Sequence, residues 1–174
     1  MHLITTPRVS LRRFRIDDLK NLSRLESDLE VMKYTPMRVA QPIEKTRERL
    51  QLIIEKQNER SPLGIWAAES IEDGSFIGWF MVNQTQYEYP ELGFMLVREA
   101  WSKGFATEIA ASLRDFALNT LGYSGLTAVT DEANGASKRV LEKIGFQFVR
   151  KFSKQDLLLG KEIELSLFEL KSRS

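Results

Sequence analysis

The stretch that most constrains this fold is a buried strand that passes through a short polar turn directly into an amphipathic helix. Residues 91–97 (ELGFMLV) are apolar apart from Glu91 and Gly93, which is typical of a strand buried on both faces. From Gly104 the apolar residues recur with the period of a helix, over residues 104–121. The turn therefore leads straight into a helix N-terminus, where free N–H groups and the helix dipole favour an anion such as phosphate.

The turn also has the small residues that close approach to a phosphate requires. Gly104 has no side chain and Ala106 has only a methyl group, so the main chain can lie near a bound anion. An ordinary strand–turn–helix, in which Gly104 serves only the turn, is the alternative that a single G-x-A spacing leaves open.

Composition disfavours several classes of chemistry. The 174 residues suit one domain with one core, which we assign to residues 1–174. The chain has no cysteine and His2 is its only histidine, which argues against thiolate catalysis, Ser-His-Asp catalysis and zinc sites. The 25 basic and 24 acidic residues give a net charge of +1, which provides no field for binding nucleic acid or a membrane surface. Without a signal-peptide core or an apolar span of membrane length, we expect a cytoplasmic protein.

The rest of the chain predicts an α/β (α+β) fold with a single mixed, mostly antiparallel sheet flanked by helices. Strands are expected at residues 9–14, 63–71, 75–84, 91–97, 125–130, 146–152 and 163–170, and helices at 18–26, 27–34, 42–59, 104–121 and 136–144. Asp17 is the expected N-cap of the first helix, and Gly145 the expected stop of the last. The apolar face of the third helix is expected to comprise Ile43, Thr46, Leu50, Ile53 and Ile54.

Three segments carry a family resemblance. The segment W-S-K-G-F-A-T-E (101–108) resembles the pyrophosphate loop Q/R-x-x-G-x-G/A of the GNAT superfamily of acetyl-CoA-dependent N-acyltransferases, with Trp101 replacing the usual Gln or Arg. The segment N-G-A-S-K-R-V-L-E-K-I-G-F (134–146) looks like N-x-x-S-x-x-V-L-E-K-x-G-F, which is found in the branch that includes the RimJ/RimL ribosomal-protein N-terminal acetyltransferases. R-R-F-R-I-D-D-L followed by S-D-L-E-V-M-K-Y is similar to the opening of that branch, except that Leu29 stands where proline is common.

The resemblance implies the GNAT fold, acetyl-CoA as cosubstrate with no metal, and direct acetyl transfer to a primary amine. It places six residues around the pyrophosphate, namely Ser102, Lys103, Gly104, Phe105, Ala106 and Thr107. It also places the main chain of Met95, Leu96 and Val97 along the pantetheine amides, in the manner of an added strand. Asn134 would lie against the pantetheine arm, although its position suits a simple helix N-cap equally well.

Two residues are candidates for proton transfer. Glu91 leads an otherwise apolar strand, so it is either the base that takes a proton from an amine, as in many members of the superfamily, or a strand-end carboxylate paired with a basic neighbour. Glu88 and Asp131 are reserve candidates for this base. Ser137 lies on or beside the apolar stripe of its helix. In the RimJ/RimL-like branch the matching serine is proposed to protonate the leaving thiolate, whereas most such serines satisfy a local backbone group.

The acceptor amine is the least determined part of this prediction. A protein α-amino group with a pKa of about 7.8 costs roughly 1 kcal/mol to deprotonate at pH 7, against roughly 4.6 for a lysine-like amine near 10.4, so a lone base favours a protein N-terminus. A small-molecule amine acceptor (polyamine, amino acid or drug) and a non-catalytic acyl-CoA-binding regulatory domain are the alternatives. Trp66, Trp79 and Tyr87 are candidates for the acceptor pocket or for the core. Both a monomer and a homodimer fit the sequence.

Overall fold

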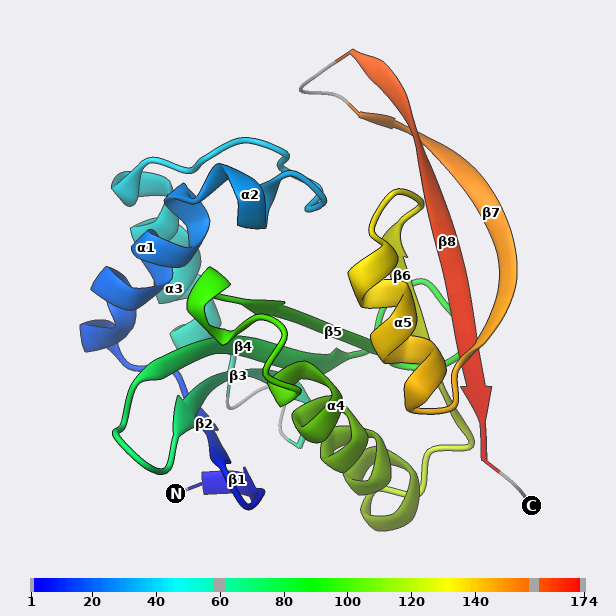
Figure 1. Ribbon diagram of the computed structural model, residues 1–174, viewed down its shortest axis with the longest axis horizontal. Coiled ribbons are helices and arrows are strands. Elements are labelled where there is room, and N and C mark those ends of the chain that lie inside the picture. The colour runs from blue at the N-terminus through cyan, green and yellow to red at the C-terminus, as the bar shows by residue number, and fades with distance from the viewer. Residues whose placement is uncertain (1, 58–61, 157–159, 173–174) are drawn as a thin grey trace.

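One open eight-stranded sheet forms the centre of the computed structural model, which describes residues 2–57, 62–156 and 160–172 (Figure 1). The strand order is β1-β2-β3-β4-β5-β6-β8-β7, and every neighbouring pair is antiparallel except β5 and β6. The strands are β1 (His2–Thr5), β2 (Val9–Arg13), β3 (Gly64–Ser70), β4 (Phe76–Asn83), β5 (Glu91–Leu96), β6 (Gly125–Asp131), β7 (Gln147–Asp156) and β8 (Lys161–Lys171). The helices are η1 (Ile16–Asp18), α1 (Leu19–Ser27), α2 (Leu29–Met32), α3 (Ile43–Lys56), η2 (Arg98–Ala100), α4 (Phe105–Asp115), η3 (Phe116–Thr120) and α5 (Gly135–Lys143).

The predicted mixed, mostly antiparallel sheet is confirmed, with β1 as an unpredicted addition. This strand has only four residues, and Pro7 follows it closely, so no alternating pattern is long enough to identify it. The helix expected over residues 104–121 instead ends at Asp115 and continues as the π-helical η3. Gly145 comes directly after Ile144, the C-cap residue of α5, and has a φ of +95°, as predicted for a helix stop.

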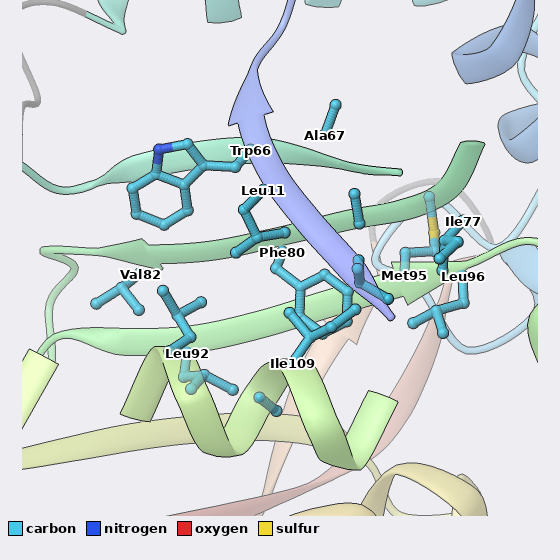
Figure 2. Packing of buried hydrophobic residues seen from close by; sticks show 14 of the residues in the cluster. Leu11, Trp66, Ala67, Ile77, Phe80, Val82, Leu92, Met95, Leu96 and Ile109 are labelled. Carbon is cyan, nitrogen blue, oxygen red and sulfur yellow. The ribbon is translucent and has the colours of Figure 1, made fainter. Parts of the chain in front are cut away.

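Helices cover the sheet on both faces. Figure 2 shows side chains of β2, β3, β4 and β5 gathered against Ile109 of α4, with Phe80 and Leu92 among them. Phe80 also stacks on Phe94, with ring centroids 5.7 Å apart. The large apolar side chains buried in this cluster include Leu11, Trp66, Phe80, Val82, Leu92, Leu96 and Ile109.

The opposite face of the sheet packs against α1 and α3. Thr46, Leu50 and Ile53 are buried and Ile54 is half-buried, as predicted. Ile43 is 42% exposed, which corrects its assignment to the apolar face: it is the first residue of α3, and the buried stripe begins one turn later. The expected end of this helix, at residues 58–59, lies outside the described residues. Within the described ranges, no helix has the length and apolar character needed to cross a lipid bilayer.

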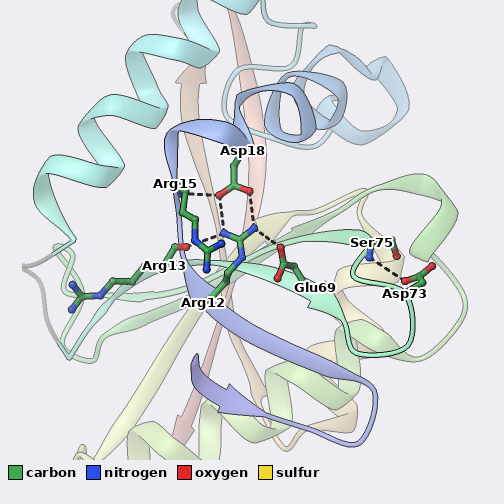
Figure 3. Close-up of polar contacts among 7 residues, drawn as sticks. All are labelled: Arg12, Arg13, Arg15, Asp18, Glu69, Asp73 and Ser75. Atoms are coloured by element: carbon green, nitrogen blue, oxygen red, sulfur yellow. Dashed lines mark hydrogen bonds and ion pairs between the residues drawn. The ribbon is translucent and has the colours of Figure 1, made fainter. Parts of the chain in front are cut away.

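A buried ion pair fixes the start of α1 on the sheet. Arg12 of β2 donates from its two terminal nitrogens to the two oxygens of Asp18, at 2.8 and 2.7 Å, and also pairs with Glu69 of β3 (Figure 3). Asp18 also accepts from the main-chain N–H of Arg15, at 2.8 Å. Hydrogen bonding to Asp18 raises the pKa of Arg12, although burial acts in the opposite direction. Asp18 therefore stands at the N-cap position expected for Asp17, and it anchors β2 instead of capping the helix.

We expect Asp18→Ala to lower the free energy of unfolding by about 3 kcal/mol, because it leaves a buried guanidinium without its bidentate partner. Asp17→Ala is the matched control: Asp17 is exposed, so its loss should change the unfolding free energy by less than about 0.5 kcal/mol. Urea denaturation of both variants measures the difference. Equal effects at the two positions would contradict an anchoring role for the Arg12–Asp18 pair.

Candidate active site

The parallel strands β5 and β6 are joined at only one end. Their register contains a single pair, Glu91 with Thr127, and the N–H of Thr127 donates to the carbonyl of Pro90 at 2.9 Å. β5 then continues to Leu96 and β6 to Asp131 without further pairing, and the two ribbons diverge (Figure 1). The strands therefore leave a wedge-shaped gap in the middle of the sheet, and β5 borders it with an unpaired main-chain edge.

Strand geometry determines which groups of β5 border this gap. The N–H of Val97 donates to Ile77 of β4 at 3.0 Å and its carbonyl accepts from Ala100 at 3.0 Å, so neither group is free. Because main-chain groups alternate in direction along a strand, Met95 also points to β4, whereas Phe94 and Leu96 point to the gap. Of the three residues predicted to contact the pantetheine amides, Leu96 therefore faces the gap, whereas Met95 and Val97 turn their main-chain groups to other parts of the chain.

Gly78 of β4 allows β5 to approach β4 closely along this edge, and no sequence prediction included it. A Cβ atom at residue 78 would lie 2.1 Å from the carbonyl oxygen of Met95 and 2.8 Å from the Cα of Leu96. Only glycine fits this approach, since the obstacle is main chain and cannot rotate away. A glycine inside a strand is the signal that could have identified the position.

The polar turn after β5 brings the first turn of α4 to the end of the gap. Ser102 and Gly104 have φ values of +60° and +81°, so the chain reverses within a few residues before Phe105 begins the helix. The first four N–H groups of any α-helix have no partner within the helix, which leaves donors here for an anion. Trp101 is 42% exposed and donates its indole N–H to the carbonyl of Leu96 at 2.9 Å, so it fastens the turn to β5.

Helix α5 begins next to the end of β6. Its N-cap is Asn134, whose side-chain oxygen accepts from the N–H of Ser137 at 3.1 Å, so the capping function is confirmed. Among the described residues, the amide nitrogen of Asn134 has no hydrogen-bond partner. Ser137 is half-buried in the first turn of α5. Lys138 pairs with Glu132 at 2.7 Å.

Glu91 is a half-buried carboxylate at the closed end of the gap. Burial raises its pKa, and the hydroxyl of Thr85 offsets part of that effect. No ion pair involves Glu91 in the described part of the chain, so the basic neighbour considered as an alternative is not found there. The carboxylate therefore has the environment expected of a proton acceptor and lacks that of a structural ion pair.

The side chain of Glu91 projects to the face of the sheet that α1 and α3 cover. Asn83 and Thr127 lie beside it in register on the two neighbouring strands, and Trp79 lies on the same face because it is four residues from Asn83. Burial raises the pKa of Tyr87, and the charge of Glu91 raises it further, which indicates that the two side chains are close. Trp79 and Tyr87 thus remain candidates for the acceptor pocket. Trp66 is only 5% exposed and lies in the core on the α4 side of the sheet, so it is not a candidate for the acceptor pocket (Figure 2).

The two reserve bases are in less suitable positions. Asp131 is buried, is ion-paired with Arg38 and accepts from the N–H of Ala133 at 2.8 Å. Arg38 also approaches Asp156 of β7 at 3.4 Å, so the Asp131 carboxylate belongs to a structural link between β6, β7 and the segment before α3. Glu88 is exposed, and it raises the pKa of the neighbouring Tyr89.

Most of the chain matches a known protein family. Residues 8–147 match the family model described as "Acetyltransferase (GNAT) domain". The uncharacterized N-acetyltransferase p20 of Bacillus licheniformis is 26% identical over 175 residues, which is 99% of this chain and 98% of that protein. A GNAT-family acetyltransferase structure from Bacillus anthracis superimposes with a TM-score of 0.84 at 23% identity and covers 98% of both chains.

Two structures of known substrate have the same fold at lower identity. An acetyltransferase from Salmonella typhimurium that modifies the N-terminal serine of ribosomal protein L7/L12 has a TM-score of 0.82 at 12% identity, covering 99% of this chain and 100% of that one. The spermidine N-acetyltransferase of Vibrio cholerae, solved with CoA and spermine, has a TM-score of 0.78 at 14% identity, covering 95% and 96%. At these identities the likeness concerns the fold, and the two proteins act on different classes of amine.

Gly104→Val should weaken coenzyme A binding at least about tenfold, because a branched side chain would stand at the helix start and a left-handed φ of +81° would be strained. Gly122→Val is the matched control: Gly122 has a similar φ of +74°, no atom lies within 4 Å of its hypothetical Cβ, and it lies beyond the far end of α4. Calorimetric titration with coenzyme A measures both variants. Equal coenzyme affinity in the two folded variants would contradict the assignment of the turn around Gly104 to the coenzyme site.

Proposed function

This chain belongs to the GNAT acetyltransferases, and from that premise we propose that it acetylates the α-amino group of a peptide or protein N-terminus, with Glu91 as the base. The proposal rests on the environment of Glu91. This carboxylate is half-buried, has a raised pKa, makes no ion pair with the residues that the structure describes and lies where β5 and β6 begin to separate. A carboxylate of this kind can accept a proton near neutral pH without being held in a salt bridge.

The residues around the gap fit acetyl-CoA. The free N–H groups at the start of α4 suit its diphosphate, and Gly104 leaves room for it. The main-chain N–H and carbonyl of Phe94 and the N–H of Leu96 have no strand partner on this side, and they suit the amides of the pantetheine arm. The strand and the pantetheine arm are both extended, and each offers amide donors and acceptors. Asn134 retains an amide donor on the opposite side of the gap.

Two residues of this chain move protons in the proposed reaction. Acetyl-CoA supplies the acetyl group as an activated thioester. Glu91 takes the proton from the acceptor nitrogen, directly or through one water, as the new N–C bond forms. Ser137 donates its hydroxyl proton to the sulfur as the C–S bond breaks and is reprotonated from solvent. Neither step requires a covalent enzyme intermediate, which agrees with a chain that has no cysteine.

The charged residues at the end of β6 offer little free negative charge for a polyamine. A hollow of about 350 Å³ beside the end of β6 is lined by Asp131, Glu132, Ala133, Ile163 and Glu164. Its acidic character is largely neutralised, because Asp131 pairs with Arg38, while Glu132 pairs with Lys138 at 2.7 Å and with Lys151 at 2.8 Å. The bonds from Lys138, Lys151 and Ser166 hold the pKa of Glu132 down to about 2. A polyamine carries several positive charges and would require carboxylates without such partners.

At pH 7 we expect kcat/KM for unblocked peptides to exceed that for an Nα-blocked lysine peptide and for spermidine by at least about tenfold. The physical reason is that the neutral fractions of α-amino and lysine-type amines differ by roughly 400-fold at this pH. Mass spectrometry of products from a matched amine panel with acetyl-CoA gives the comparison. A preference for spermidine would assign a small-molecule acceptor instead, and coenzyme binding without transfer to any amine would support a non-catalytic domain.

Glu91→Gln should lower kcat/KM by roughly 10²-fold at neutral pH, because the amide keeps the shape of the side chain and removes its basicity. Raising the pH to 9 should restore part of the activity, since more of the acceptor is then already neutral. The sign for stability follows from the raised pKa: the parent loses stability as the pH rises through that pKa, so the stability of Glu91→Gln relative to the parent should improve from pH 4 to pH 8. Rate profiles and thermal midpoints across this range measure both effects.

Ser137→Ala provides the contrast for this experiment. It should lower kcat by roughly 10²-fold with little change in the KM for acetyl-CoA, and high pH should not rescue it, because the missing proton is needed by the leaving thiolate. A Glu91→Gln enzyme that melts early yet keeps the parent pH profile would remove Glu91 from the proposed mechanism.

A further inference from the structure

The turn between β1 and β2 packs directly against the start of α4. Thr6 donates its hydroxyl hydrogen to Glu108 in the first turns of α4 at 2.6 Å, and the main-chain N–H of Arg8 donates to the same oxygen at 3.2 Å. About 100 residues separate the two segments in sequence, so sequence periodicity gives no indication of this contact. The N-terminal hairpin is therefore part of the structure that surrounds the polar turn after β5.

The guanidinium of Arg8 makes the most extensive contacts at this junction. Its Nε and Nη2 lie 2.7 and 2.6 Å from the second oxygen of Glu108, and its Nη1 donates to the carbonyl of Lys103 at 3.0 Å. The group also lies over the ring of Phe105, 4.5 Å from the centroid. A Cβ atom at Gly104 would be 3.4 Å from Nη2, which places the guanidinium beside the residue where the helix begins.

This arrangement resolves an electrostatic conflict at the start of α4. A carboxylate near a helix N-terminus is attracted by the same positive dipole end that would bind a phosphate, and it repels that phosphate. Burial opposes the ionisation of Glu108, but the bonds from Thr6 and Arg8 outweigh it and lower the pKa of Glu108. The carboxylate is therefore charged. Its two oxygens are bonded to the hairpin, and Arg8 supplies the compensating positive charge.

We propose that Arg8 is a positioning residue for the diphosphate of the coenzyme: it neutralises Glu108, holds the carbonyl of Lys103 and leaves the N–H groups of the helix start open to the phosphates. This inference rests on the coenzyme site of the proposed function. It also relates to Trp101, which occupies the position where the family pattern has Gln or Arg but uses its only polar group on the carbonyl of Leu96. In this chain the guanidinium at the turn comes from the N-terminal hairpin instead.

A double-mutant cycle on Arg8 and Glu108 tests the inference, with coenzyme A as the probe in calorimetric titration. Arg8→Ala should raise the Kd for coenzyme A about tenfold, because it leaves the negative charge of Glu108 uncompensated beside the phosphates. Glu108→Gln alone should bind as tightly as the parent or more tightly. The double variant should return to within about threefold of the parent, because the unfavourable charge is gone. Arg47→Ala, which removes an exposed arginine from α3, is the matched control and should leave the Kd unchanged.

The readouts separate this role from a purely structural one. Loss of packing would lower the thermal midpoint of Arg8→Ala, and Glu108→Gln would not correct it, whereas charge neutralisation predicts recovery of coenzyme affinity and a kcat at saturating acetyl-CoA close to that of the parent. If Arg8→Ala does not fold, Arg8→Gln, which keeps a donor for the carbonyl of Lys103, allows the same comparison. Parent-like binding by the Arg8 variant, or a double variant as weak as the single one, would overturn the inference. Failure of the parent protein to bind coenzyme A would instead overturn the proposed site itself.

Discussion

The hydrogen bond from the N–H of Thr127 to the carbonyl of Pro90 marks the point where the two halves of the sheet stop being joined. Glu91 and Thr127 form the single residue pair between β5 and β6, and beyond this pair β5 has no neighbouring strand on that side. Buried backbone groups are costly to leave unsatisfied, so an edge of this kind inside a sheet suits the extended partner invoked in the proposed function. The polar turn, the start of α4 and the start of α5 all border the space that this separation creates.

A single strand serves three purposes because its groups point in three directions. The side chains of Leu92, Phe94 and Leu96 pack toward α4, whereas Glu91 and Met95 project to the face covered by α1 and α3. The main-chain groups of Phe94 and Leu96 lie in the plane of the sheet and face β6. The proposed coenzyme binding, the core packing and the proposed proton transfer therefore use different groups of one short segment. A shift of one residue in its register would disturb all three.

Local signals in the sequence predicted a large part of this arrangement. The strand–turn–helix around Gly104, the Asn134 cap and the unusual position of Glu91 each depend on residues near in sequence, which is why their positions could be predicted. The contacts of Arg8, Arg38 and Gly78 could not be, because each depends on a partner that only the tertiary fold brings near. The same limit explains why Asp17 was predicted as the N-cap of α1 instead of Asp18. Helix-start propensity does not reveal that the Asp18 carboxylate binds Arg12.

Arg38 also constrains how this protein can change over evolutionary time. It has a φ of +55°, donates to the carbonyl of Lys33 at 3.1 Å and is ion-paired with Asp131, so one residue holds the segment between α2 and α3 in place. On either side of it, Met37 and Val39 are 38% and 41% exposed. Substitutions at these two flanking positions leave the anchor intact. The exposed side chains of this segment could therefore diverge on a fixed backbone, without renewed adaptation of the core.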